Sequence, residues 1–272
     1  MMDGKFEVAF LGTNGSCAYN GGRRKKYGTN TLCVAARAGG ETLIFDSGSG
    51  ICGFGGLEGF QREHCHIFFS HYHIDHFSGF LFFSQFFDAE KSFDIYGASH
   101  EGKDFYGVVN QFISPPLHPI HIGSFNAGIR YNTISAGEEI AIGNGVKVRT
   151  YPLSHPSGTV GYRVECGGKA FCYCTDIELA EHLNDEAFEA FTHKADLLVL
   201  DTFFDDGGCI PGWGHSSWRE AAQWAKRVDA KKLALFHYGY RLEDEDIDEM
   251  ERRSRKIFPN TFAASDFMRV EL

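Results

Sequence analysis

The first half of the chain alternates short apolar runs with turn residues, a pattern that is typical of β-strands. Runs at residues 5–11, 30–37 and 42–45 predict three short strands, and a Gly-Gly pair between the last two predicts a hairpin turn. A fourth run, at residues 64–70, contains Ile-Phe-Phe at 67–69 and predicts a buried strand.

Two further hairpins are predicted by Asn144-Gly145 and Gly167-Gly168, each flanked by β-branched or aromatic residues. These turns place residues 146–152, 159–166 and 169–174 in antiparallel strands. The segment therefore reads as a second run of paired strands.

Helical patterns alternate with apolar strands in the last third of the chain. The predicted elements are a helix at 178–191, a strand at 196–200, a helix at 216–228, a strand at 232–236 and a helix at 243–257. The final helix begins with acidic and ends with basic residues, which complement the helix dipole. Two packed sheets faced by outer helices fit this order, so the sequence predicts an α/β fold. No repeat or linker divides the chain, and we expect one domain over residues 1–272.

The formal charge of −10 narrows the range of partners. Basic residues are scattered except for the run Arg23, Arg24, Lys25 and Lys26, which argues against a long nucleic-acid duplex but permits a small anion in a locally positive pocket. The N-terminus lacks a basic region followed by an apolar run, and the aromatic stretch at 77–87 is too short for a membrane span. We therefore expect a cytoplasmic protein without membrane contact.

The eight cysteines are dispersed, so we expect reduced thiols rather than disulfides. Cys172 and Cys174 would face the same side of a strand. That spacing leaves a metal site open as an alternative, with small buried core residues as the simpler interpretation.

The segment from Ser70 to His76, Ser-His-Tyr-His-Ile-Asp-His, carries the densest candidate chemistry. His71 and His73 would project to one side of the strand end, while Asp75 and His76 would come from the turn that opens the next helix. A chance cluster of polar residues would leave imidazoles and a carboxylate unsatisfied at the end of a buried strand, a cost that metal binding removes. Imidazole and carboxylate suit zinc or manganese better than a soft metal.

Three later residues stand in the same position, directly after an apolar strand: His155, Asp176 and His237. Alone, each has an ordinary interpretation, as a loop histidine, a helix N-cap and a structural histidine. Because all of them follow strand ends, we expect them to converge with the first cluster at one edge of the fold.

The order HxHxDH, then His, then Asp, then His resembles the metallo-β-lactamase superfamily over essentially the whole chain. Other segments are similar more narrowly to its tRNase Z and phosphodiesterase branch. They are Phe-Leu-Gly-Thr at 10–13, Phe-Asp-Ser-Gly-Ser-Gly at 45–50, Gly-Tyr-Arg at 161–163 after His155, and Gly-His-Ser-Ser at 214–217 after Leu-Asp-Thr-Phe at 200–203. The resemblance implies a four-layer αββα fold.

The resemblance also implies two divalent metal ions. One would be bound by His71, His73 and His155, the other by Asp75, His76 and His237, with Asp176 bridging them. Asp46 would support the metal-binding loops from behind the ligands, although a turn-forming Asp is an equal alternative. Zinc is the favoured metal, with manganese or iron as alternatives.

His215 would act as general acid or oxyanion stabiliser near the leaving-group oxygen. Asp201 would orient His215 at a place where the branch often has Glu, and Asp75 counts among the catalytic residues as well as the ligands. Attack on a phosphodiester by a metal-activated water would follow.

We expect a metal-dependent hydrolase, most readily a phosphodiesterase acting on a small phosphodiester or cyclic nucleotide. The alternatives are tRNA 3′ processing, with RNA the less favoured partner because the chain lacks a long basic insertion, and hydrolysis of a lactone, thioester or sulfate ester. A non-catalytic carrier is a weaker alternative. A homodimer is expected only by resemblance.

Arg23, Arg24, Lys25 and Lys26 could hold a substrate phosphate at the active-site rim, or form a solvated basic loop. Aromatic residues of segment 77–87 could stack a base, although core packing is the simpler expectation. The remaining histidines are expected to be structural or surface residues: His64, His66, His100, His118, His121, His182 and His193.

Overall fold

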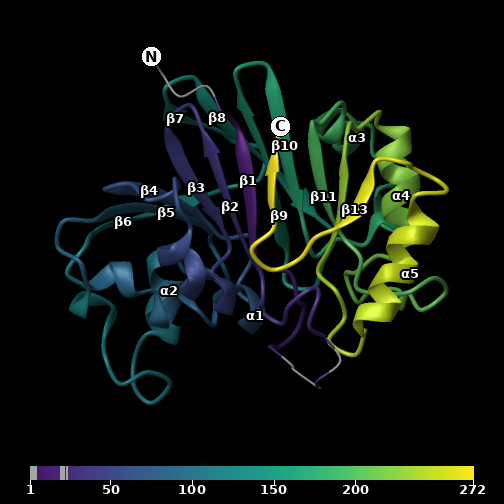
Figure 1. Ribbon diagram of the computed structural model, residues 1–272. Coiled ribbons are helices and arrows are strands. Elements are labelled where there is room, and N and C mark those ends of the chain that lie inside the picture. The colour runs from purple at the N-terminus through teal and green to yellow at the C-terminus, as the bar shows by residue number, and fades with distance from the viewer. Residues whose placement is uncertain (1–4, 19–21, 23) are drawn as a thin grey trace.

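Two mixed seven-stranded sheets face each other, and helices cover their outer faces (Figure 1). The computed structural model describes residues 5–18, 22 and 24–272. Helices α1 (Ile74–Phe77) and α2 (Phe105–Phe112) lie against the first sheet, and α3 (Glu186–Thr192), α4 (Trp218–Arg227) and α5 (Asp244–Ser254) lie against the second. The expected four-layer αββα architecture is confirmed.

The first sheet has the strand order β14-β1-β2-β3-β4-β5-β6. Its strands from β14 to β3 pair antiparallel, and those from β3 to β6 pair parallel. The bounds are β1 Glu7–Gly12, β2 Cys33–Ala38, β3 Glu41–Phe45, β4 His64–Phe68, β5 Ser92–Ala98, β6 Gly128–Ile134 and β14 Arg269–Glu271. The last strand, β14, therefore pairs with the first strand, β1, in the same sheet.

The second sheet has the order β13-β12-β11-β10-β9-β8-β7. It runs antiparallel from β7 to β10 and parallel from β10 to β13. The bounds are β7 Glu139–Gly143, β8 Val146–Leu153, β9 Thr159–Cys166, β10 Lys169–Cys174, β11 Leu197–Asp201, β12 Leu233–Phe236 and β13 Thr261–Ala263. All three predicted hairpin turns join antiparallel strands as expected.

The core consists of three apolar layers. The central layer lies between the sheets, where Phe45 packs its ring within 5.6 Å of the rings of Phe68, Phe171 and Tyr162. Each outer layer lies between one sheet and its helices. Cys172 and Cys174 belong to the layer under α4, and all eight cysteines are free thiols, as predicted.

The predicted helix at 178–191 is wrong as one continuous element. A 3-10 turn at Leu179–His182 precedes α3, because the Asp185 carboxylate accepts hydrogen bonds from the N–H of Phe188, the Tyr151 hydroxyl and His182 Nδ1. That carboxylate caps a new helix instead of continuing an old one. Strands β5, β6, β13 and β14 and helix α2 were not predicted from the sequence.

The aromatic segment 77–87 contributes mainly to the core. Phe77, Phe80, Phe83 and Phe86 are buried under the first sheet, whereas Phe82 is 67% exposed. None of the helices in the described part of the chain is long and apolar enough to cross a bilayer.

We expect Phe171→Ala to lower the free energy of unfolding by about 3–5 kcal/mol, because it removes a fully buried ring between the sheets. Phe82→Ala is the matched control and should change stability by less than about 0.5 kcal/mol. Denaturant unfolding followed by circular dichroism measures both. Equal losses in the two variants would contradict the assignment of the central layer as the main core.

Candidate metal centre

The candidate site residues lie where strands of both sheets end. Asp46 and the segment from Ser70 onward follow β3 and β4 of the first sheet, and the other candidates follow β8, β10, β11 and β12 of the second sheet. These strands are mutually parallel within each sheet, so their carboxyl ends share one edge. The strand topology thus delivers side chains that are far apart in sequence to one place.

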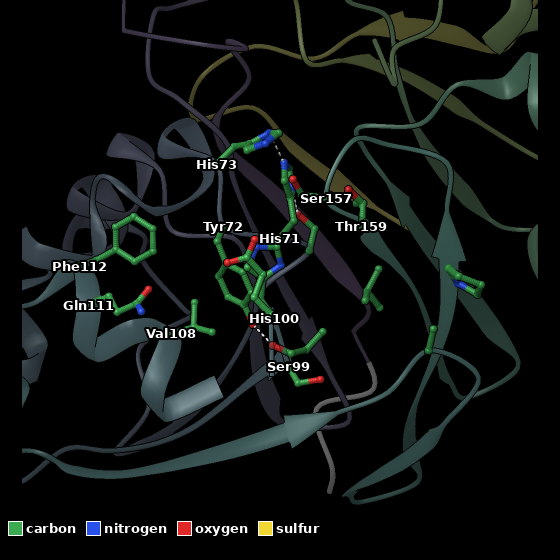
Figure 2. Close-up of a pocket in the computed structure, with 17 residues that line it drawn as sticks. His71, Tyr72, His73, Ser99, His100, Val108, Gln111, Phe112, Ser157 and Thr159 are labelled. Carbon is green, nitrogen blue, oxygen red and sulfur yellow. Dashed lines mark hydrogen bonds between the residues drawn. The ribbon is translucent and has the colours of Figure 1, made fainter. Parts of the chain in front are cut away.

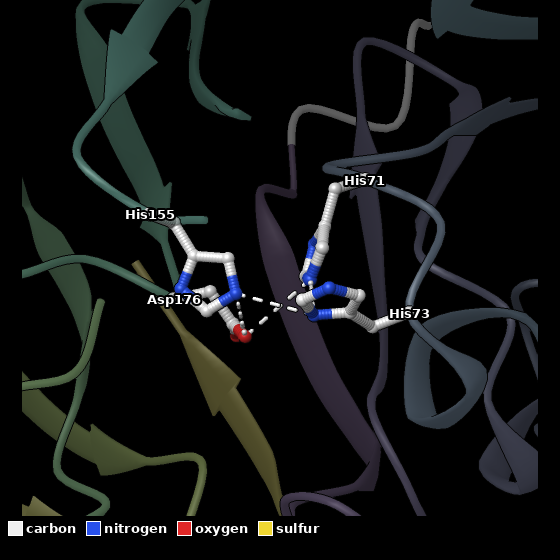
Figure 3. Close-up of side chains that lie close together, drawn as sticks. All are labelled: His71, His73, His155 and Asp176. Atoms are coloured by element: carbon white, nitrogen blue, oxygen red, sulfur yellow. Dashed lines mark hydrogen bonds and ion pairs between the residues drawn. The ribbon is translucent and has the colours of Figure 1, made fainter. Parts of the chain in front are cut away.

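Four side chains form the first ligand cluster (Figure 3). His71 Nε2 lies 2.9 Å from His73 Nδ1, and His155 Nε2 lies 3.2 Å from the same atom. Both His71 Nε2 and His155 Nε2 lie 3.5 Å from Asp176 Oδ2. The first sheet supplies two of these histidines, and the second sheet supplies His155 and the carboxylate.

The second cluster uses the other oxygen of the same carboxylate. His76 Nε2 and His237 Nε2 lie 3.2 and 3.0 Å from Asp176 Oδ1. Asp75 Oδ2 completes the group, 3.6 Å from His76 Nε2 and 3.4 Å from His237 Nε2. Asp176 therefore lies between the two clusters with one oxygen toward each.

These side chains fit a pair of divalent metal ions. Ligand atoms bonded to zinc at about 2.0–2.1 Å in a tetrahedron lie about 3.3 Å apart, and the separations above fall between 2.9 and 3.6 Å. The Nε2 atoms of His76 and His237 are also buried without a hydrogen-bond partner among the described residues. A cation between them and the carboxylates satisfies these atoms.

The electrostatics of the clusters favour positive charge. Burial raises the pKa of Asp176, but His237 and His76 outweigh it and hold that pKa well below its usual range. Burial lowers the pKa of His76, but Asp176 and Asp46 outweigh it and raise that pKa well above its usual range. At His71 burial prevails and lowers the pKa, so this imidazole keeps a lone pair for a metal.

Asp46 lies directly behind the ligands and is fully buried. Its Oδ1 accepts the N–H of Ser70 at 2.7 Å, and its Oδ2 accepts from the Ser70 hydroxyl at 2.7 Å, from His76 Nδ1 at 2.8 Å and from the Tyr173 hydroxyl at 2.8 Å. The bond to His76 fixes the ring so that Nε2 faces the second cluster. The hydroxyl of Tyr173 comes from the opposite sheet and ties the two halves of the centre together.

Three site residues have left-handed backbone conformations. The φ angles of Asp46, Asp176 and His237 are 57°, 52° and 60°. Such conformations are unfavourable for residues other than glycine, and each turns the chain sharply at the end of a strand. The turn carries the side chain back over the sheet edge toward the clusters.

Glu178, which was not predicted as a site residue, positions His155 through a glycine-containing loop. Glu178 Oε2 accepts the backbone N–H groups of Gly212 and Gly214 at 2.8 and 3.2 Å, and the carbonyl of Gly214 lies 2.8 Å from His155 Nδ1. A Cβ on Gly214 would lie 2.1 Å from His155 Nδ1, so only glycine fits. Glu178 stands two residues after Asp176, but nothing local in the sequence links it to residue 214.

A second contact that was not predicted from the sequence comes from the loop after β1, which contains Gly15 and Ser16. The N–H of Ser16 donates to Asp75 Oδ2 at 2.7 Å. The preceding residue, Gly15, packs directly on His237, because a Cβ there would lie 2.5 Å from the ring. The loop therefore closes the second cluster from the N-terminal side.

His215 and Asp201 form a hydrogen-bonded pair beside both clusters. His215 Nδ1 lies 2.7 Å from Asp201 Oδ2, and the imidazole stacks on Phe203 at a centroid distance of 4.5 Å. The ring centroids of His155 and His237 are 5.1 and 5.0 Å from that of His215. The carboxylate of Asp201 therefore reaches His215, although its side chain is shorter than that of Glu.

A cavity of about 440 Å³ opens beside the first cluster (Figure 2). His71, Tyr72 and His73 form one wall, and Val108, Gln111 and Phe112 of α2 line it beyond Tyr72. His73 is exposed on this side, so the first cluster is open to solvent. The volume is that of a small-molecule site.

The basic run is partly engaged in the fold. Arg23 lies outside the described residues. Arg24 is buried and donates to the carbonyls of Gly239 and Leu242, and the N–H groups of Lys25 and Lys26 donate to Asp244. A contact of this run with substrate stays a prediction.

Residues 61–238 match a family model described as the β-lactamase superfamily domain. The chain is 24% identical to a protein named Ribonuclease Z from Archaeoglobus fulgidus, with 98% of each chain covered. Among solved structures it resembles the metallo-β-lactamase fold protein YhfI from Bacillus subtilis, with a TM-score of 0.74, 17% identity and 99% and 100% of the two chains covered. It also resembles a diphosphatase from the PhnP family, with a TM-score of 0.71, 16% identity and 98% of each chain covered.

We expect Asp46→Asn to weaken zinc binding by about 10–100-fold, because an amide cannot accept all the hydrogen bonds that fix His76 and Ser70. Titration against a chromophoric chelator measures the affinity. Glu90→Gln, an exposed change from carboxylate to amide, is the control. Unchanged affinity in Asp46→Asn would show that this carboxylate does not support the centre.

Proposed function

This chain is a metal-binding hydrolase of the β-lactamase superfamily, and we propose a more specific function for it. We propose that it is a phosphodiesterase with two metal ions that acts on small phosphodiesters. The observation that carries the proposal is the position of Asp176, with Oδ2 toward three histidines and Oδ1 toward two histidines and a carboxylate. Zinc is the proposed metal in both positions because the donors are imidazoles and carboxylates.

The side chains of the two clusters would hold a pair of divalent ions, which when bound would supply Lewis-acid polarisation of a phosphoryl oxygen and a more acidic water. The protein residues position these groups. Asp176 and Asp75 contribute the negative charge that balances the cations, and Asp46 and the Gly214 carbonyl fix the rings of His76 and His155.

His215 is the proposed general acid. Its Nδ1 is held by Asp201, so the proton that it gives to a leaving oxygen lies on Nε2. Asp201 Oδ1 is itself held by the N–H groups of Phe203 and Ser216, at 2.9 and 3.3 Å. The carboxylate therefore keeps one orientation and holds the His215 ring in place.

A small substrate is supported by the cavity beside His71 and His73 and by the acidic character of the chain. The cavity volume of about 440 Å³ suits one nucleoside-sized group rather than a folded RNA. The formal charge of −10 opposes the approach of a polyanion.

Processing of tRNA 3′ ends is the second candidate. A relative named Ribonuclease Z aligns over 98% of both chains, which favours it independently of the cavity. Turnover of bis-p-nitrophenyl phosphate and of cyclic nucleotides, compared with cleavage of a precursor tRNA by the same zinc-loaded protein, decides between the two. A kcat/KM that is higher for the precursor tRNA would overturn the small-substrate proposal. The homodimer expected by resemblance is tested separately, by measuring the mass of the protein in solution.

We expect His215→Ala to lower kcat for bis-p-nitrophenyl phosphate by about 10²–10⁴-fold, because the leaving oxygen loses its proton donor. Metal content should stay at the wild-type value. His193→Ala, which removes an exposed imidazole, is the control and should retain full activity. A loss of metal in His215→Ala would instead make His215 a ligand.

We expect Gln111→Trp to raise KM for a cyclic nucleotide by about tenfold, equivalent to about 1.4 kcal/mol, because the indole fills the cavity. Asn110→Trp on the same helix lies outside the cavity lining and serves as the control. Steady-state kinetics measure both. An unchanged KM in Gln111→Trp would place the substrate elsewhere.

A further inference from the structure

A separate group of side chains of the types that bind metals lies at the opposite end of the first sheet. His64, His66 and Asp94 offer ligand atoms that all lie within 4.8 Å of one another. His66 precedes His71 by five residues, which is roughly 15 Å along an extended chain. The group is therefore distinct from the dinuclear centre, although we expected both histidines to be merely structural or surface residues.

Strand register places these side chains on one face of the sheet. His64 and His66 are two residues apart on β4 and so point to the same side. Asp94 on β5 pairs directly with His66 in the parallel ladder. The same face carries Phe68 of the layer between the sheets, so the three side chains lie at one end of the inter-sheet space.

The distances match a metal shell that is partly formed. His64 Nε2 lies 3.4 Å from Asp94 Oδ2, close to the separation of about 3.3 Å between ligands on one tetrahedral zinc ion. The ring centroids of His64 and His66 lie 4.8 Å apart. His64 Nδ1 lies 2.8 Å from the Ser92 hydroxyl, a contact that fixes the ring with Nε2 toward the carboxylate.

Glu41, the first residue of β3, adds a second carboxylate beside the group. Its Oε2 lies 3.9 Å from His66 Nε2, while its Oε1 accepts from the side-chain amide of Asn144 at 2.7 Å. Asn144 belongs to the β7–β8 turn of the other sheet. An ion bound here would join β3, β4 and β5 and, through Glu41, the opposing hairpin.

The charges around the group favour a cation. Two carboxylates, Asp94 and Glu41, lie beside the histidines, and the guanidinium of Arg130 lies 3.2 Å from Asp94 Oδ1. The other oxygen of Asp94 is directed at His64.

We infer that His64, His66 and Asp94 form a mononuclear site for a borderline divalent cation such as zinc, with Glu41 or water as the fourth ligand. The three protein ligands supply two nitrogens and one oxygen, and the fourth ligand completes the tetrahedron that zinc prefers. The ion stabilises the first sheet, because binding to the folded state alone adds free energy of unfolding. The site takes no part in the hydrolysis and does not depend on the proposed function.

The test compares the metal stoichiometry of wild type, His64→Ala and Asp94→Asn. His64 is suitable because its side chain is 40% exposed, and Asp94→Asn keeps the shape of the residue it replaces. Each protein is loaded with zinc, freed of excess by gel filtration and measured by atomic emission. His121→Ala, an exposed histidine outside the group, is the matched control.

The expected result is about one zinc fewer per chain in His64→Ala and Asp94→Asn than in wild type and His121→Ala, with unchanged turnover of bis-p-nitrophenyl phosphate. Added zinc should also raise the Tm of wild type more than that of either variant. Equal zinc content and equal zinc-dependent Tm shifts in all four proteins would overturn the proposal and leave the group as a network of ion pairs. Failure of the phosphodiesterase proposal would appear in turnover alone and would leave this stoichiometry unaffected.

Discussion

The arrangement of the whole site depends on the buried carboxylate of Asp176. An ionised carboxylate in a protein interior is costly unless its oxygens are matched by positive charge or donors. Here each oxygen faces its own group of histidines, and the side chain is 2% exposed. Because one rigid planar group serves both clusters, their spacing and orientation are set together.

The histidines that surround the Asp176 carboxylate come from both sheets. The first group of ligands follows β4, and the others follow β8, β10 and β12, which belong to the other half of the chain. Hydrogen bonds between the two sheets hold these halves in register. The Tyr162 hydroxyl donates to the Phe69 carbonyl at 2.5 Å, and the N–H of Val160 donates to the Ser70 carbonyl at 2.9 Å. Together with the bond from Tyr173 to Asp46, these contacts surround the segment that carries His71.

The parts of this structure that follow from the sequence are those encoded locally. The HxHxDH segment, the three hairpin turns and the strands next to them are recognisable because period, turn residues and ligand types lie within a few positions of one another. The helix predicted at 178–191 is interrupted because Asp185 accepts a hydrogen bond from Tyr151, a residue 34 positions away. Glu178 and Ser16 were missed for the same reason, since their roles exist only through loops that the fold brings to them.

Edge strands were also hard to predict. β6 has only one buried residue, Ile134, so it lacks the apolar alternation that identifies a half-buried strand. β13 and β14 are three residues long, which is too short for any periodicity to show.

The pairing of β14 with β1 has a consequence for biosynthesis. β1 emerges from the ribosome more than 250 residues before its outer neighbour, since Glu7 pairs with Glu271. Throughout that interval one edge of β1 carries unpaired N–H and C=O groups, which are the usual template for association with another nascent chain. Emergence of the β14 segment is therefore the earliest event that can end the exposure of this edge. The time before it is set by the rate of translation rather than by the rate of folding.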